Sequence, residues 1–252
     1  MRILSLLAAL MMFLPPSPGA AAMGALAAPT SCPTPAEFTT ATTPLGHLAA
    51  AVKARQKLHI LAVGSATMRA PGRAPAGTGF AQRMTDALHR AWPGSEISID
   101  IEGHKGITAA EQLALIRAAL ARGGYQLVIW QTGTVDALRG TAPAEFAATL
   151  AAGAESAGAA RADLVLVDQQ FTRMLEERAN LAPYQQALHA TASAPGRLLF
   201  RRYDLMRQWA EGGVIDLEHA TPGTRLSLAE SLHRCLGLAL AALVIDAVAR
   251  AS

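Results

Sequence analysis

Hydroxyl-bearing side chains follow directly after a strongly apolar run in the first third of the chain. The segment 58–63 is apolar except for one histidine, Gly64 ends it, and Ser65, Ala66 and Thr67 come next. This pattern predicts a buried parallel strand that breaks into a turn. In an open α/β sheet, ligands bind at the carboxyl ends of such strands. A serine or threonine placed there can attack an ester carbonyl if a histidine accepts its proton.

Further turns carry polar side chains that could join such a site. The turn at 103–106 holds His104 and Lys105, which either line a pocket for an acidic or acylated sugar or simply face water. Later turns supply polar residues that either bind a polar ligand or cap helices. These residues are Thr132, Thr134, Asp136 and Gln169.

Strand patterns alternate with helical patterns along the chain. Strands are expected near 58–63, 97–101, 125–130, 164–168 and 198–200, and the longer helices near 47–55, 80–92, 108–121, 142–160 and 226–250. Alternation at this spacing requires a parallel sheet with helices on both faces. We therefore expect one three-layer α/β/α domain with a five-stranded parallel sheet.

Composition excludes several classes of protein. The 252 residues are 51% hydrophobic and carry 22 basic and 19 acidic side chains, a net charge of +3. Because no basic stripe with interleaved aromatic residues is present, we expect no nucleic-acid partner. The apolar run at 236–244 is too short to span a bilayer, so no membrane span is expected in the mature chain. Without metal-ligand clusters, a phosphate-binding loop or a dinucleotide fingerprint, we also expect no metal and no cofactor.

The N-terminus has the pattern of a secretory signal. Arg2 precedes an apolar stretch at 3–14, which prolines and small residues follow. The mature protein would then be periplasmic or secreted, where disulfides persist. Cys32 and Cys235 either pair, tying the N-terminal segment to the last helix, or remain two buried thiols. The expected organisation is a signal peptide at 1–28, an irregular lead-in at 29–46 and a single domain at 47–252.

Taken in order, the strand-end blocks resemble those of the SGNH (GDSL-type) hydrolases. The resemblance is strongest to an exported bacterial branch whose first block reads Gly-Ser-Ser-Ser-Thr. It covers about residues 47–245 and includes the flanking sequences Leu-Val-Ile-Trp-Gln-Thr-Gly-Thr at 127–134 and Phe-Arg-Arg-Tyr at 200–203. It implies a flavodoxin-like fold and ester hydrolysis by a serine nucleophile, a histidine base and an orienting aspartate. A glycine and an asparagine would help the serine amide to stabilise the oxyanion.

Carried over position by position, the resemblance leaves one of the five expected functional residues in place. The nucleophile position is Ala66, the oxyanion glycine is Gly106, and the asparagine position is Val135. Counted without gaps, the aspartate and histidine positions before the last helix are Thr224 and Ser227. An alanine has no atom that could attack an ester. The resemblance therefore implies a degenerate homologue with no catalytic residues.

An alternative set of residues could restore an esterase. Asp216 and His219 form an intact Asp-x-x-His eight residues before the expected place, and Ser65 adjoins the vacant nucleophile position. Side chains alternate along a strand, so Ser65 should point away from Gly106. We therefore favour a solvated loop for Asp216 and His219, and keep the relocated triad as the alternative.

The favoured expectation is a binding or accessory protein. Its partner would be a cell-envelope glycan, an acylated carbohydrate or an envelope protein. Possible ligand-binding residues are Thr67, His104, Lys105, Thr134 and Arg225.

Overall fold

The protein is built around one parallel β-sheet. The computed structural model describes residues 31–70, 74–75 and 77–251, so the expected signal peptide lies outside the described residues. The sheet has five strands in the order β2-β1-β3-β4-β5, and every pair is parallel. The strands are β1 (Leu58–Val63), β2 (Ile97–Glu102), β3 (Leu127–Gln131), β4 (Asp163–Val167) and β5 (Arg197–Phe200). The expected five-stranded parallel sheet is confirmed.

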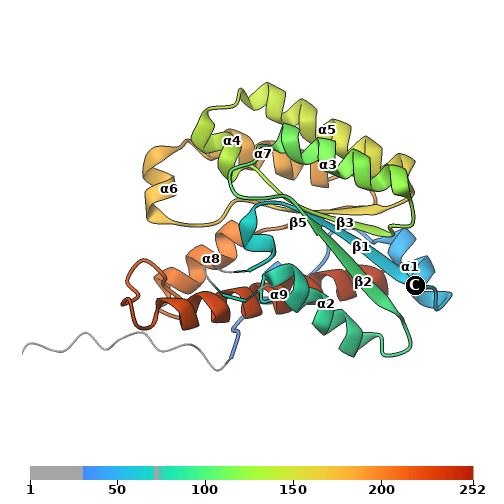
Figure 1. The fold of residues 1–252 in the computed structure, drawn as a ribbon, viewed down its shortest axis with the longest axis horizontal. Helices are drawn as coiled ribbons and strands as arrows, with labels where there is room; N and C mark the ends of the chain where they lie inside the picture. Colours follow the sequence, from blue (N-terminus) through green and yellow to red (C-terminus); the bar gives the residue numbers. More distant parts are fainter. Residues whose placement is uncertain (1–30, 71–73, 76, 252) are drawn as a thin grey trace, which may run out of the picture.

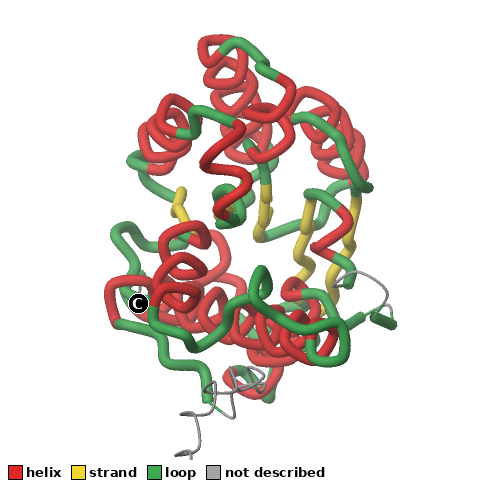
Figure 2. Tube along the Cα trace, turned by 90° about the vertical axis from the view of Figure 1, so that its left-hand side faces the viewer, coloured by secondary structure: helices red, strands yellow, loops and turns green. Residues whose placement is uncertain are grey.

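Helices cover both faces of the sheet (Figures 1 and 2). One face carries α3 (Ala109–Arg122), α5 (Pro143–Ala159) and α7 (Ala182–Ala192), and the other carries α1 (Gly46–Lys53), α2 (Phe80–Ala91), α8 (Arg202–Glu211) and α9 (Arg225–Ala249). Short elements complete the described chain: η1 (Ala36–Phe38), η2 (Ala66–Met68), α4 (Thr134–Arg139) and α6 (Arg173–Arg178). This is the expected three-layer α/β/α arrangement.

The strand sequences explain why the sheet is buried on both faces. In β1, Ile60 and Ala62 pack toward α2 and α9, whereas Leu61 and Val63 pack toward the α3 side. Successive side chains of a strand point to opposite faces, so a nearly continuous apolar run suits a strand covered twice. Strand β2 lies at the sheet edge and is only half-buried over most of its length, as its mixed sequence predicted.

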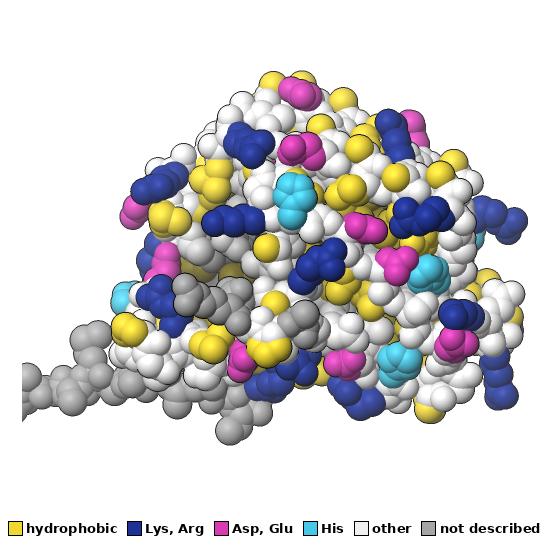
Figure 3. Space-filling view, in the orientation of Figure 1, with side chains coloured by type: hydrophobic (Ala, Val, Ile, Leu, Met, Phe, Trp, Pro, Cys, Tyr) yellow, Lys and Arg dark blue, Asp and Glu magenta, His cyan; other side chains and the backbone are white. Residues whose placement is uncertain are grey.

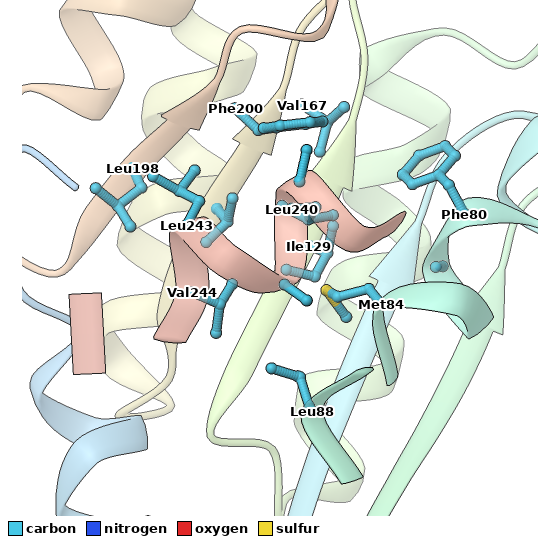
Figure 4. Packing of buried hydrophobic residues seen from close by; sticks show 14 of the residues in the cluster. Phe80, Met84, Leu88, Ile129, Val167, Leu198, Phe200, Leu240, Leu243 and Val244 are labelled. Carbon is cyan, nitrogen blue, oxygen red and sulfur yellow. The ribbon is translucent and has the colours of Figure 1, made fainter. Parts of the chain in front are cut away.

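Helix α9 forms the centre of one core. Its residues Leu240, Leu243 and Val244 face strand residues that include Ile129 and Phe200, and α2 packs beside it (Figure 4). Helix α9 is the described helix that is long and apolar enough to cross a membrane, but 67% of its most apolar window is buried inside the fold. Its hydrophobicity is therefore used in packing against α2 and the sheet.

The segment before α1 is attached to the last helices by several bonds. A disulfide joins Cys32 to Cys235, the two residues whose pairing we weighed above. The indole of Trp209 donates to the Pro33 carbonyl at 2.7 Å, and the Ala41 amide donates to the Asp246 carboxylate at 2.8 Å. These bonds fix the described part of the lead-in to the domain. Within residues 32–45, the described segment is irregular except for the single 3-10 turn η1.

Charges of both signs are scattered over the face shown in Figure 3, where Lys and Arg side chains lie among Asp and Glu side chains.

The strand-end turn at 131–136 folds differently from our expectation, because α4 begins at Thr134. Gly133 makes this possible because it adopts a left-handed conformation with φ +91°, and a Cβ there would meet the Gln169 amide at 2.5 Å.

Candidate functional site

A cavity of about 930 Å³ lies where the turns after β1, β2 and β3 meet. The right-handed βαβ connections bring the carboxyl ends of these parallel strands to one edge of the sheet. The described residues that line it are Ser65, Ala66, Thr67, Arg69, Ala70, Gly103, His104, Lys105, Gly106, Ile107, Gln112, Gln131, Thr132, Gly133, Thr134, Val135, Leu138, Arg139 and Gln170. We call this space the strand-end cavity.

The structure brings together the three strand-end positions taken from the resemblance. Ala66, Gly106 and Val135 all line the strand-end cavity, from η2, the turn after β2 and the first turn of α4. A substrate carbonyl held beside Gly106 would therefore face the methyl group of Ala66 instead of a hydroxyl. Val135 offers no side-chain donor at the asparagine position. The three positions that the resemblance assigns to the nucleophile, the oxyanion glycine and the asparagine therefore meet at one cavity.

Among the possible ligand-binding residues, Thr67, His104, Lys105 and Thr134 line the strand-end cavity, and Arg225 does not. The Arg225 guanidinium donates instead to the Ala220 carbonyl at 3.4 Å, within its own turn.

Thr224 and Ser227, at the expected aspartate and histidine positions, lie at the start of α9. Thr224 is the residue before the helix, and its hydroxyl lies 2.9 Å from the Thr221 hydroxyl. The Ser227 hydroxyl donates to the Thr224 carbonyl at 2.9 Å. Both side chains bond only within this exposed turn, and neither lines the strand-end cavity.

The Ser65 hydroxyl belongs to a small hydrogen-bonded group at the wall of the cavity. It lies 3.0 Å from the Thr67 hydroxyl and accepts a hydrogen bond from Gln131 Nε2 at 3.2 Å. Thr67 in turn donates to Gln131 Oε1 at 3.3 Å. Each of the three side chains is thus bonded to the other two, and none of them is a base that could take a proton from Ser65.

Our expectation that Ser65 points away from Gly106 rested on the alternation of side chains along a strand, whereas Ser65 and Gly106 line the same cavity. Strand β1 ends at Val63, and Ser65 is the residue before η2. Alternation of side chains holds only along an extended strand, so it does not apply to the turn.

Asp216 and His219 form the pair that the alternative esterase requires, at a different place. His219 Nδ1 lies 2.7 Å from Asp216 Oδ2, and Arg173 holds the same carboxylate at 3.3 Å. Burial alone would raise the pKa of Asp216, but hydrogen bonds from His219 and from the backbone, together with the charge of Arg173, lower it overall. Asp216 is therefore ionised and buried. Our expectation that it is solvated was wrong, because folding brings Arg173 and His219 to its carboxylate and the sequence does not show these contacts. His219 is mostly exposed, and neither residue lines the strand-end cavity.

The strand-end cavity is basic. Arg69, Lys105 and Arg139 line it, and none of its described lining residues is an acid. Arg69 donates to the Ile101 carbonyl, and Arg139 lies 3.9 Å from Glu111, whose carboxylate is mainly bonded to Thr108 at the start of α3. Positive charge in a concave site without carboxylates raises the local concentration of anions.

Asp136 holds the turn beside Gly106 in position. Its buried carboxylate accepts from the Ala109 amide at 3.0 Å and thereby fixes the first turn of α3, next to the capping box that Thr108 forms with Glu111. Burial raises the pKa of Asp136, and this backbone hydrogen bond opposes the rise. Asp136 is thus a helix-capping residue, the second of the two roles considered for it.

Sequence reasoning missed Arg69 and Arg139 as lining residues. Arg69 follows η2, and Arg139 ends α4, a helix that the sequence pattern did not reveal. The sequence signal that could have identified them as lining residues is their position shortly after the end of a strand. Within the described residues, no three His, Cys, Asp or Glu side chains form a group that could hold a metal ion.

Comparisons with known proteins agree with this fold. TesA matches with 24% identity over 71% of this chain and 97% of its own, with a TM-score of 0.51. A putative SGNH hydrolase from Slackia heliotrinireducens matches with 23% identity over 74% of this chain and 98% of its own, with a TM-score of 0.52. An acetyl-xylooligosaccharide esterase from Geobacillus matches with 14% identity over 71% of this chain and 91% of its own, with a TM-score of 0.55.

Among curated protein sequences, no significant relative is found. A family model described as the non-GDSL lipase-like family matches residues 31–250, nearly all of the described chain and including the segment from Cys32 to α1. The chain has the fold of the SGNH hydrolases and belongs to the non-GDSL lipase-like family.

Proposed function

We propose that this chain is an exported, non-hydrolytic binding protein that holds an acidic or acylated carbohydrate in the strand-end cavity. The observation that carries the proposal is the position of Ala66. It lines the cavity beside Gly106 at the nucleophile place, where an enzyme of this fold needs a hydroxyl. A cavity that lacks the attacking atom can still bind what its relatives cleave.

The chemistry of the lining supports a carbohydrate ligand. Hydroxyl and amide groups of Thr67, Thr134 and Gln170 can exchange hydrogen bonds with sugar hydroxyls, and Val135 and Leu138 give apolar surface. Arg69, Lys105 and Arg139 favour a sugar that carries a carboxylate, a sulfate or a phosphate. The Geobacillus neighbour acts on acetylated xylooligosaccharides, so a chain of this fold can accommodate an acylated oligosaccharide.

A titration with three oligosaccharides of similar length tests the proposal. The probes are hexagalacturonate, acetylated xylohexaose and unsubstituted xylohexaose, followed by calorimetry and by amide chemical shifts. We expect saturable binding of the first or second probe, with shifts at the turns after β1, β2 and β3 and no release of acetate. Equal binding of all three, or of none, would contradict the proposal.

A second candidate is an esterase that uses Ser65, His219 and Asp216. The 2.7 Å contact between His219 and Asp216 favours it, because such a contact orients a catalytic histidine. It requires Ser65 to leave Gln131 and Thr67 and to meet His219. Acetate released from acetylated xylohexaose, and lost in Ser65→Ala, would support this candidate over the first.

A further inference from the structure

Two backbone amides at the wall of the strand-end cavity have no acceptor within the protein. Ala66 and Gly106 both line the cavity, and neither of their N–H groups donates to another described residue. A backbone amide is a strong hydrogen-bond donor, so each of these two can donate to a bound group instead. Two such donors at one wall favour an acceptor that carries negative charge.

The guanidinium of Arg139 reaches the same wall. A Cβ placed on Gly106 would lie 3.8 Å from Arg139 Nη2. Arg139 follows Val135 by four residues on α4, and residues at this spacing share one face of a helix. The helix that brings Val135 to the asparagine position therefore also brings an arginine beside Gly106. Arg139 supplies the side-chain donor that Val135 lacks, and it adds a full positive charge.

The donors of Arg139 are largely free for a ligand. Among the described acids it pairs only with Glu111, at 3.9 Å, and it donates no hydrogen bond to a described residue. The Glu111 carboxylate accepts from the Thr108 amide at 2.7 Å and from the Thr108 hydroxyl at 2.9 Å. These bonds lower the pKa of Glu111 more than the charge of Arg139 does. Glu111 is thus mainly a helix-capping residue, and Lys105 adds a second positive charge next to Gly106.

We propose that Arg139 and the amides of Ala66 and Gly106 bind an anionic group of the carbohydrate, either a carboxylate or a sulfate. This inference rests on the proposed function and selects an acidic ligand over a neutral acylated one. A guanidinium can hold two oxygens of such a group at once. Because Ala66 has no hydroxyl, the bound group meets a methyl group and is held without being attacked.

The size of the cavity fits the acidic group together with its neighbouring sugars. A volume of about 930 Å³ holds about thirty non-hydrogen atoms at the share of about 30 Å³ that a water takes in the liquid. This corresponds to about two sugar residues. The acidic group would lie at Gly106, and the sugar rings would lie against Val135 and Leu138.

Pairs of oligosaccharides that differ in charge test the proposal. Hexagalacturonate is compared with its methyl ester, and sulfated xylohexaose with unsubstituted xylohexaose, by calorimetry and by amide chemical shifts. At least one acidic chain should bind about tenfold more tightly than its neutral counterpart, because hydrogen bonds to a charged group contribute more than those to a neutral group. That chain should shift the amides of Ala66 and Gly106. Equal affinities within both pairs, or unshifted Ala66 and Gly106 amides, would overturn the proposal.

Substitutions at the cavity wall locate the acidic group. Arg139→Gln should remove most of the preference for the acidic chain, whereas Arg178→Gln, at the exposed end of α6, should keep it. Ala66→Asp places a carboxylate where the acidic group should lie and should weaken that chain about tenfold or more, whereas Ala148→Asp on the exposed side of α5 should not. An unchanged preference in Arg139→Gln, or unchanged affinity in Ala66→Asp, would overturn the proposal.

The failure of this inference can be told apart from the failure of the proposed function. Binding of acetylated xylohexaose without binding of either acidic chain would overturn the role of Arg139 and leave carbohydrate binding in place. Binding of none of these oligosaccharides would overturn both.

Discussion

His219 Nδ1 lies 2.7 Å from Asp216 Oδ2, yet neither residue lines the cavity that contains Ala66. The pair has the contact of a catalytic histidine and its orienting acid, but Asp216 is also bonded to Arg173, which bonds Glu218 as well. This network fixes the loop between α8 and α9 against the first residue of α6. The geometry therefore gives the pair a structural role that needs no catalysis.

Restoring the nucleophile alone should not restore hydrolysis. In Ala66→Ser the new hydroxyl would stand at the cavity wall, but Thr224 and Ser227 bond within the first turn of α9 and supply neither acid nor base. Catalytic triads act as a unit, so a serine without its histidine gains little. Hydrolysis of 4-nitrophenyl acetate by Ala66→Ser should equal that of the wild-type chain. A rate well above it would mean that a nearby base, such as His104, serves the cavity.

The basic lining should control binding of an acidic carbohydrate. The double variant Lys105→Glu with Arg139→Glu should weaken hexagalacturonate about tenfold at low salt, and the difference should shrink as salt rises. The double variant Lys53→Glu with Arg90→Glu, on α1 and α2 and outside the cavity lining, changes the net charge by the same amount and should have little effect. Equal losses in both variants would show that only overall charge matters.

The disulfide should contribute strongly to stability because it closes a loop of 203 residues. Reducing it, or replacing both cysteines with alanine, should lower the free energy of unfolding by about 2–4 kcal/mol. Urea unfolding with and without reductant measures this difference. The double alanine variant should not respond to reductant, and a response there would point to another cause.

His233 should make the protein less stable as the pH falls. Burial and the charge of Arg202 lower its pKa to about 4 in the folded state, below the ordinary 6.5 of the unfolded chain, so the unfolded state takes up a proton first. The stabilisation is complete above about pH 6.5 and is lost as the pH falls toward 4, by about 3 kcal/mol. Relative to His233→Phe, which keeps a ring but cannot titrate, the wild-type chain should lose this amount in urea unfolding between pH 7 and pH 4.

Asp168 acts in the opposite direction, because burial raises its pKa to about 7 and the folded state binds its proton first. Asp168 is present in both the wild type and His233→Phe, so its effect cancels in the difference between their free energies of unfolding. A constant difference between wild type and His233→Phe across this pH range would contradict the assignment to His233.

Local sequence patterns were enough to locate the strand ends. Three apolar runs end at Gly64, at the turn before Gly106 and at Gly133, and they predicted the carboxyl edge of the sheet. Ala66, Gly106 and Val135 line one cavity at this edge. The direction of Ser65 was not predictable because it depends on the 3-10 turn that follows β1.

The buried polar groups were also invisible in the sequence. Arg202 and His233 lie on helices whose neighbours in sequence are both polar and apolar, so burial came only from packing against Phe80 and the sheet. From the sequence, Asp216 is expected to be a solvated acid in a loop. In the folded protein its carboxylate contacts Arg173 and His219. Such positions are set by contacts between distant segments, which periodicity does not report.

The central claim is that the strand-end cavity binds without cleaving, and serine-directed labelling tests it most directly. The purified mature protein is incubated with a fluorophosphonate and with 4-nitrophenyl butyrate, and any adduct is located by peptide mass mapping. We expect no adduct and a rate equal to that of buffer. An adduct on Ser65, together with turnover that is lost in Ser65→Ala and His219→Ala but kept in the exposed control His89→Ala, would contradict the claim and establish a relocated triad.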